Sequence, residues 1–126
     1  MRAQFQILVI PFRKTMEGLE FAVLKRRDTT CWQFVSGGGE DSETSEQAAQ
    51  SETVEEIGIS APLIPLDSFS TVPKSCFAAA DSWEDDIFVI PQYCFAVNIA
   101  TSVIILSDEH TEFQWVSYDQ AHTMLK

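Results

Sequence analysis

The sequence predicts an α+β fold in which a mixed, curved β-sheet lies between helices, an α/β/α sandwich. The first observation is a series of apolar runs of strand length. The second is a well-capped helical segment in the middle of the chain, and the third is another helical segment near its C-terminal end. Strands mixed with a few helices are typical of a sheet layered against helices. At 126 residues we expect a single domain over 1–126.

Apolar runs bounded by turn residues predict strands in both halves of the chain. The first, FQILVIPF, is the most continuous, and the third leads directly into three glycines. The fourth contains a proline, which predicts an edge or bulged strand because proline has no N–H to donate to a neighbour. The predicted strands are residues 5–12, 19–27, 31–36, 87–99 and 113–117.

The helical segment behind the glycines has clear start and end signals. Thr44 is the expected N-cap, and Gln47 stands three residues later in capping-box position. Gly58 suits the position that follows the last turn. We therefore expect a helix over about residues 45–57. A second helix begins in 118–126 without a stop signal, so it is expected to be short or truncated.

The net charge of −11, from 19 acidic and 8 basic residues, restricts the partners. Nucleic acid polymers and anionic membranes both require basic surface, so neither is expected to bind. No apolar stretch is long enough to span a membrane, and the N-terminus lacks a signal-peptide pattern. Cys31, Cys76 and Cys94 have neither disulfide-type nor zinc-type spacing. We expect a cytoplasmic monomer or homodimer that acts on a small molecule.

Acidic side chains are concentrated on one side of the predicted central helix. At 100° per residue, Glu52, Glu55 and Glu56 fall within one arc. Thr53, Val54 and Ile57 are expected on the other side, facing the sheet. Oxygen ligands grouped in this way suit a hard cation such as Mg²⁺ or Mn²⁺. The alternative interpretation is a solvated acidic face without a ligand.

The segment 37–59 has the residue spacing of the Nudix box, G-x5-E-x7-R-E-U-x-E-E-x-G-U, where U is aliphatic. The chain therefore resembles the Nudix (MutT-like) hydrolases, and the late segment SDEHTEFQWVS extends the resemblance. Its lead-in RRDTTCWQFVSGGGED is most similar to the bacterial dihydroneopterin triphosphate and dATP pyrophosphohydrolases. The matching positions are Gly37, Glu43, Glu52, Glu55, Glu56, Gly58 and Ile59.

Two residues depart from this motif. Ser51 stands at the arginine position, and Thr53 stands at an aliphatic position. In the family the arginine pairs with and orients a catalytic glutamate, and a serine cannot form that two-pronged bond. Either Arg26, Arg27 or Lys25 compensates from the neighbouring strand, or activity is lowered.

The resemblance implies Mg²⁺-dependent cleavage of a nucleoside or pterin triphosphate to a monophosphate and pyrophosphate, with Mn²⁺ as another possible ion. It places the site on acidic residues of the helix and of the late segment. His110 is expected to be structural or solvent-facing. The candidate catalytic residues are Glu52, Glu55 and Glu109; the candidate metal ligands are Glu52, Glu55, Glu56 and Glu109; the candidate substrate contacts are Arg26, Trp32, Ser36 and Gly37.

Three alternatives to a triphosphate pyrophosphohydrolase remain at this stage. Two lie within the family, a hydrolase of a nucleoside-diphosphate sugar and a hydrolase of a dinucleoside polyphosphate. Outside catalysis, the replacement at Ser51 suggests a weak enzyme that senses a nucleotide. A Walker A loop is excluded, because no Gly-Lys-Ser/Thr follows the glycines. Phe77 and Trp83 are further candidates for stacking on a base.

Overall fold

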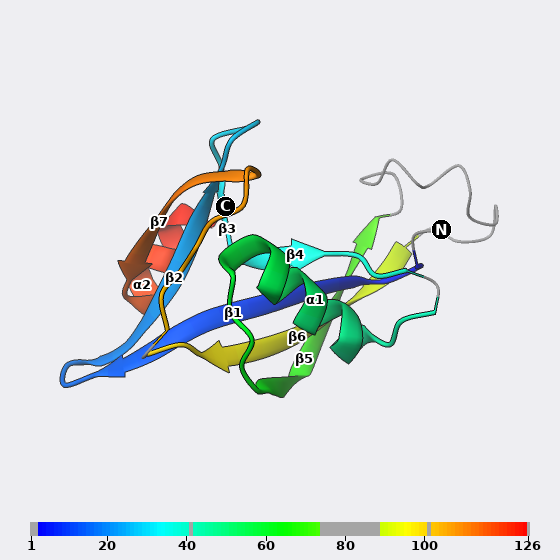
Figure 1. Cartoon of the computed structure of the whole chain (residues 1–126), viewed down its shortest axis with the longest axis horizontal. Helices are drawn as coiled ribbons and strands as arrows, with labels where there is room; N and C mark the ends of the chain where they lie inside the picture. The colour runs from blue at the N-terminus through cyan, green and yellow to red at the C-terminus, as the bar shows by residue number, and fades with distance from the viewer. Residues whose placement is uncertain (1–2, 41, 74–88, 101, 126) are drawn as a thin grey trace.

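The computed structural model describes residues 3–40, 42–73, 89–100 and 102–125, so Phe77 and Trp83 lie outside the described residues. The described part forms a sheet and two helices (Figure 1). The elements are β1 (Gln6–Thr15), β2 (Gly18–Arg26), β3 (Trp32–Gln33), β4 (Val35–Gly37), α1 (Ser45–Ile57), β5 (Leu63–Pro73), β6 (Val89–Asn98), β7 (His110–Val116) and α2 (Tyr118–Met124).

The strands form one mixed sheet in the order β3-β2-β1-β6-β5, with β4 paired to β1 and β7 paired to β2. β1 and β6 are parallel, and the other described pairs are antiparallel. Residues 7–9 of β1 pair with β4, whereas residues 12–15 pair with β2. The predicted third strand is therefore divided, because β3 pairs with β2 and β4 pairs with β1.

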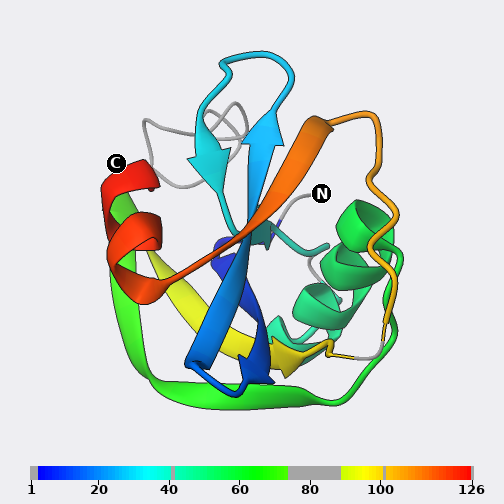
Figure 2. The same cartoon turned by 90° about the vertical axis from the view of Figure 1, so that its left-hand side faces the viewer.

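The helices cover different faces of the sheet (Figure 2). Val23 and Leu24 are neighbours in β2, and adjacent side chains of a strand point to opposite faces. Leu24 packs in a core cluster with Ala49 and Ile57 of α1. Val23 packs in a second cluster with Ala121 of α2. This arrangement confirms the predicted α+β fold, with a mixed sheet between helices.

The boundaries of α1 are those predicted from its capping residues. The Thr44 side chain accepts a hydrogen bond from the Gln47 backbone N–H, and the Gln47 side chain accepts one from the Thr44 N–H. Gly58 ends the helix in the left-handed region, with φ of 69°. The expectation for Val54 is wrong, because its side chain is 46% exposed, whereas Ile57 is buried as expected.

The edge-strand prediction for the proline-containing run is also wrong, because β6 lies between β1 and β5. Pairing of β6 with β1 begins at Gln92, so Pro91 lies beyond that ladder, opposite Thr71 of β5. A missing N–H at Pro91 therefore costs no β1–β6 bond. The irregularity in this part of the sheet is in β5, between Pro65 and Phe69. Among the described residues, no helix is long and apolar enough to cross a membrane.

Candidate active site

A cleft of about 630 Å³ lies where the end of β2, the strand β4, the helix α1 and the segment before β7 meet. It combines two arginines with four acidic side chains. Five residues predicted from the sequence are brought together here, although they come from four separate segments. The lining residues are Arg26, Arg27, Asp28, Ser36, Gly37, Glu52, Asp108 and Glu109.

Gly37 allows β4 to approach the carboxyl group of Glu52 closely. A Cβ atom added at Gly37 would lie 2.6 Å from Cδ of Glu52, closer than real Cβ contacts. Glu52 is half-buried, and burial raises the pKa of its carboxyl group, with a smaller contribution from the charges of Glu55 and Glu109. The glycine therefore fixes where Glu52 lies at the wall of the cleft.

Glu56 lies one turn after Glu52 and is almost completely buried, with 2% of its surface exposed. Neither carboxyl oxygen of Glu56 has a hydrogen-bond partner in the described part of the chain. Burial raises the pKa of this group strongly, and the carboxyl groups of Glu52 and Glu109 raise it further. A buried carboxylate without a partner is unfavourable, so this position requires either a proton or a cation.

His110, which was expected to be structural or solvent-facing, is buried next to Glu56. Its Nε2 atom lies 3.9 Å from Oε1 of Glu56 and 2.9 Å from Nε2 of Gln33. Burial lowers the pKa of His110, which favours the neutral imidazole. A bond from the Gln33 amide makes Nε2 the acceptor, which places the ring proton on Nδ1. In the sequence, the Glu-His pair at 109–110 was the available signal for a role of His110, but such a pair does not show whether the histidine is buried.

A divalent metal ion fits the donor atoms at the floor of this cleft. One donor atom each from Glu56, Glu109 and His110 lies within 4.8 Å of the other two. The carboxylate oxygens of Glu56 and Glu109 are hard ligands suited to a divalent cation, whereas Nε2 of His110 is already bonded to the Gln33 amide. An ion here would also supply the partner that the buried oxygens of Glu56 lack. The residues present therefore fit a metal site.

Besides the buried Glu56, two predicted site residues lie outside the cleft lining. Glu55 is exposed on α1 and is absent from both the cleft and the group of metal donors. Trp32 packs at the edge of the second core cluster, on the side of the sheet that α2 covers, and the Lys25 ammonium lies 5.9 Å from its ring centroid. The structure therefore gives Trp32 the core environment usual for an aromatic strand residue.

Ser51, at the arginine position of the box, makes a weak contact with Glu43. Its hydroxyl donates to Oε2 of Glu43 at 3.3 Å, and the other oxygen of Glu43 accepts from the Glu40 backbone N–H at 2.8 Å. The three basic residues expected to compensate have other partners within the described ranges. Arg26 binds Asp28, Arg27 binds a backbone carbonyl, and Lys25 lies over Trp32.

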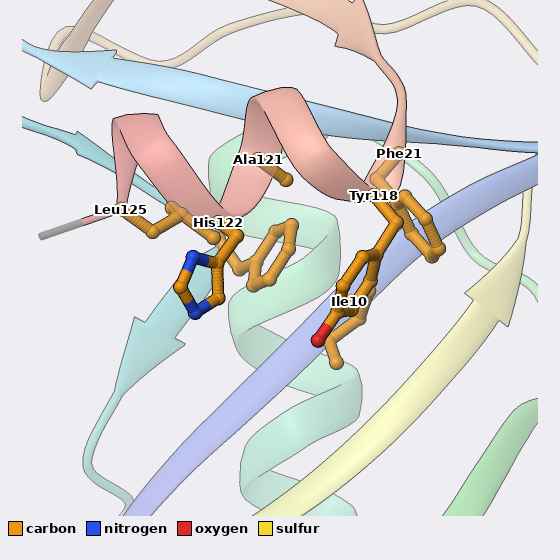
Figure 3. Close-up of a pocket in the computed structure, with 7 residues that line it drawn as sticks. Ile10, Phe21, Tyr118, Ala121, His122 and Leu125 are labelled. Carbon is orange, nitrogen blue, oxygen red and sulfur yellow. The ribbon is translucent and has the colours of Figure 1, made fainter.

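An apolar pocket of about 490 Å³ lies between the sheet and α2, with His122 and Tyr118 at its edge (Figure 3). Phe34 lines this pocket, and Ser36 lines the acidic cleft. These residues are two positions apart, which in extended chain is roughly 7 Å. Phe34 precedes β4, and the pocket lies on the face of the sheet that α2 covers, whereas the cleft lies beside α1, so the chain segment 34–36 separates the two. The pocket is lined by Ile10, Phe21, Phe34, Tyr118, Ala121, His122 and Leu125.

Comparison with known proteins gives a consistent result. The profile of the NUDIX domain matches residues 4–126. The structure is similar to that of a protein from Listeria monocytogenes assigned to the Nudix hydrolases, with a TM-score of 0.84 and 40% sequence identity. That match covers 97% of this chain and 83% of the Listeria chain. Among curated proteins, none matches the chain significantly.

Two more distant structures share the fold. The E. coli dihydroneopterin triphosphate pyrophosphohydrolase has a TM-score of 0.79 at 23% identity, and the match covers 99% of this chain and 88% of that one. A C. elegans Ap4A hydrolase in a binary complex has a TM-score of 0.71 at 21% identity, with 98% and 86% covered. These two likenesses concern the fold.

Proposed function

Because this chain belongs to the NUDIX domain family and is a Nudix-type hydrolase, we propose that it cleaves a nucleoside or pterin triphosphate to a monophosphate and pyrophosphate, with Mg²⁺ as cofactor and Mn²⁺ as an alternative. The observation that carries this proposal is the buried Glu56 carboxyl group without a partner among the described residues, next to Glu52 and Glu109 at an anion-accessible cleft. Arg26 supplies a cation at the same cleft.

Six acidic, basic and hydroxyl side chains at and beside the cleft have a proposed role. Glu52, Glu56 and Glu109 would hold the ion, which when bound offsets charge on phosphate oxygens and lowers the pKa of water. Glu109 is exposed at the cleft, so its carboxylate can also accept a proton from the attacking water. Arg26 binds the phosphate oxygens, and Ser36 donates to the substrate from β4. Glu55 acts only through its charge on Glu52.

The apolar pocket supports a substrate with a flat ring. It is lined by aromatic and aliphatic side chains and is separated from the cleft by the segment 34–36. A purine or a pterin joined to a triphosphate has this combination of an apolar ring and an anionic chain. The E. coli relative is a dihydroneopterin triphosphate pyrophosphohydrolase and the C. elegans relative is an Ap4A hydrolase, so both compounds belong in a substrate panel.

The proposed activity is tested by measuring release of pyrophosphate and phosphate from dNTPs, dihydroneopterin triphosphate, ADP-ribose and diadenosine polyphosphates, with Mg²⁺ and with Mn²⁺. We expect metal-dependent pyrophosphate release from at least one triphosphate. Glu56→Gln should lower kcat by at least about 100-fold, because it removes a charged ligand from the cation. Glu46→Gln is the matched control, since it makes the same charge change at an exposed residue of the same helix.

A different result would select another function. Release of nucleoside monophosphates from diadenosine polyphosphates or ADP-ribose alone would replace the triphosphate assignment with the dinucleotide or sugar-nucleotide assignment. The weak Ser51–Glu43 contact favours one non-enzymatic alternative, a nucleotide sensor. Binding of a nucleotide by the folded protein without turnover of any compound would contradict catalysis and support this sensor.

A further inference from the structure

Arg26 and Asp28 form a two-pronged ion pair at the mouth of the acidic cleft. Nε of Arg26 donates to Oδ1 of Asp28 at 2.8 Å, and Nη2 donates to Oδ2 at 2.6 Å. Both residues line the cleft. A guanidinium group binds phosphate with the same pair of parallel N–H groups. The Asp28 carboxylate therefore occupies the donors of Arg26 that are best arranged to bind a phosphate.

The other basic side chains near this site are already engaged elsewhere. Nε of Arg27 donates to the backbone carbonyl of Asp108 at 2.8 Å, which fixes the segment before β7. Lys25 does not line the cleft and lies over the ring of Trp32. Among the described residues, Arg26 and Arg27 are thus the two cleft cations, and Arg26 is the one whose Nε and Nη2 are held by a carboxylate. The hydrogen bond to Asp28 is the largest cause of the raised pKa of Arg26, and the charges of Glu109 and Glu56 raise it further. Arg26 is therefore also close to the proposed metal ligands.

The ion pair is formed at neutral pH but is weak enough to be displaced. The hydrogen bond from Arg26 holds the pKa of Asp28 at about 2, so the carboxylate is ionised. The side chains of Arg26 and Asp28 are 43% and 60% exposed, and ion pairs at such exposure contribute little to stability. A multivalent phosphate can therefore compete with Asp28 for the same guanidinium group.

The turn around Asp28 is closed by backbone-to-backbone hydrogen bonds, in addition to the contacts that the Asp28 carboxylate makes with the backbone N–H groups of residues 28 and 29. The backbone N–H of Arg26 donates to the Cys31 carbonyl at 2.8 Å, and the N–H of Thr30 donates to the Arg26 carbonyl at 3.1 Å. These bonds close the connection between β2 and β3. Replacing the carboxylate by an amide should free Arg26 without opening the turn.

From these contacts we propose that Asp28 is an internal competitor of the substrate, which lowers the affinity of the cleft for phosphate groups by occupying Arg26. The inference rests on the proposed function, because it concerns the phosphate end of that substrate. Asp28 does not contact the reacting atoms in this scheme and acts through Arg26. Its removal should therefore change KM and pyrophosphate affinity, while kcat stays the same.

The test compares Asp28→Asn with a matched control, Glu20→Gln. Glu20 also pairs with an arginine through short contacts, because Nε and Nη2 of Arg13 both lie 2.8 Å from Oε1 of Glu20, but neither residue lines the cleft. Both substitutions remove one negative charge from the chain, so the control separates a local effect from the change in net charge. The probe is inorganic pyrophosphate, titrated calorimetrically in the presence of Mg²⁺, and thermal unfolding is recorded for each variant.

We expect Asp28→Asn to bind pyrophosphate about two- to fivefold more tightly, the effect expected from an exposed ion pair. The same factor should appear as a lower KM at constant kcat, and it should decrease at high salt because the ion pair is screened. Glu20→Gln should bind like the wild type. Arg26→Gln should bind more weakly, and adding Asp28→Asn to Arg26→Gln should give no further gain.

Unchanged or weaker pyrophosphate binding by Asp28→Asn would overturn the inference, and the weaker result would show that Asp28 orients Arg26. A gain that persists without Arg26, or that appears equally in Glu20→Gln, would also overturn it. These outcomes are distinct from failure of the proposed function. A wild type that releases no pyrophosphate from any substrate refutes the function, whereas tighter pyrophosphate binding by Asp28→Asn still supports the competition. A wild type that binds no pyrophosphate overturns the competition, whereas the proposed function is judged by turnover.

Discussion

At the scale of single residues, Glu56 is where burial and charge conflict most strongly. Its carboxyl group is inside the protein, beside Glu52, and neither oxygen has a partner among the described residues. Burial lowers the pKa of the nearby His110 and keeps it neutral, so it does not neutralise Glu56. The protein must therefore protonate this glutamate or bind a cation, and its stability should report which of these occurs.

The metal-free protein should lose stability as the pH rises from 5 to 8. The folded state raises the pKa of Glu56 above its usual value of 4.5, so over this range the folded state holds more protons than the unfolded state. The stabilisation from this proton is complete below the pKa that Glu56 has in the unfolded state. It is lost as the pH rises toward the pKa that Glu56 has in the folded state. A tenfold difference in proton affinity between the two states corresponds to about 1.4 kcal/mol, or roughly 5 °C in Tm at this chain length.

The measurement is thermal unfolding in EDTA across this pH range. Glu56→Gln should flatten the profile, whereas the exposed Glu46→Gln should leave it unchanged. Added Mg²⁺ should restore stability most at the upper end of the range, because binding requires the ionised carboxylate. A wild-type profile as flat as that of Glu56→Gln would contradict the raised pKa.

At the scale of elements, α1 determines the geometry of the site because it carries Glu52 and Glu56 one turn apart. Its N-terminus is fixed by a capping box at Thr44, and the close approach of β4 at Gly37 sets its distance from the sheet. The helix α2 has an equivalent capping box at Ser117 but carries no member of the acidic cleft. The two helices therefore offer a comparison between stability and site geometry.

Thr44→Ala and Ser117→Ala should each lower the free energy of unfolding by about 1 kcal/mol, since each removes the side-chain acceptor of an N-cap. The two variants should differ in metal binding. Thr44→Ala frays the start of the helix that carries the carboxylates and should weaken Mn²⁺ binding, whereas Ser117→Ala should not. Denaturant unfolding and Mn²⁺ titration measure the two effects. Equal Mn²⁺ affinity in both variants would mean that the N-terminal turn of α1 does not influence the site.

At the scale of the whole molecule, the sheet separates an apolar pocket under α2 from an acidic cleft between the end of β2 and α1. Phe34 belongs to the first and Ser36 to the second. Under the proposed function, the ring of the substrate depends on the pocket and its phosphates depend on the cleft, so the two ends can be tested separately.

Phe34→Ala should raise KM for the preferred ring-bearing triphosphate by about tenfold, because it removes an aromatic surface worth roughly 1.4 kcal/mol. Binding of inorganic pyrophosphate should not change, since that ligand has no ring. Phe113→Ala is the matched control, because Phe113 is a partly exposed strand phenylalanine that lines neither cavity. If Phe34→Ala raises KM and weakens pyrophosphate binding by the same factor, the ring and the phosphates do not occupy separate positions.

The sequence by itself determined the class of fold, the limits of α1 and the family of this protein. These features depend on local signals: the capping residues Thr44 and Gln47, the left-handed position at Gly58, and the fixed spacing of acidic residues on one helix. Helical geometry alone places side chains four residues apart on one face. Such information is contained in short segments, so it does not require knowledge of the tertiary contacts.

Only the tertiary structure decided how those segments meet. It moved the proline-containing strand to the interior of the sheet, placed His110 beside Glu56, and kept Glu55 and Trp32 out of the cleft lining. It also paired Arg26 with Asp28 at the cleft. Burial and pairing depend on contacts between residues distant in sequence, and the same side chain is a solvated charge or a buried ligand according to what packs against it.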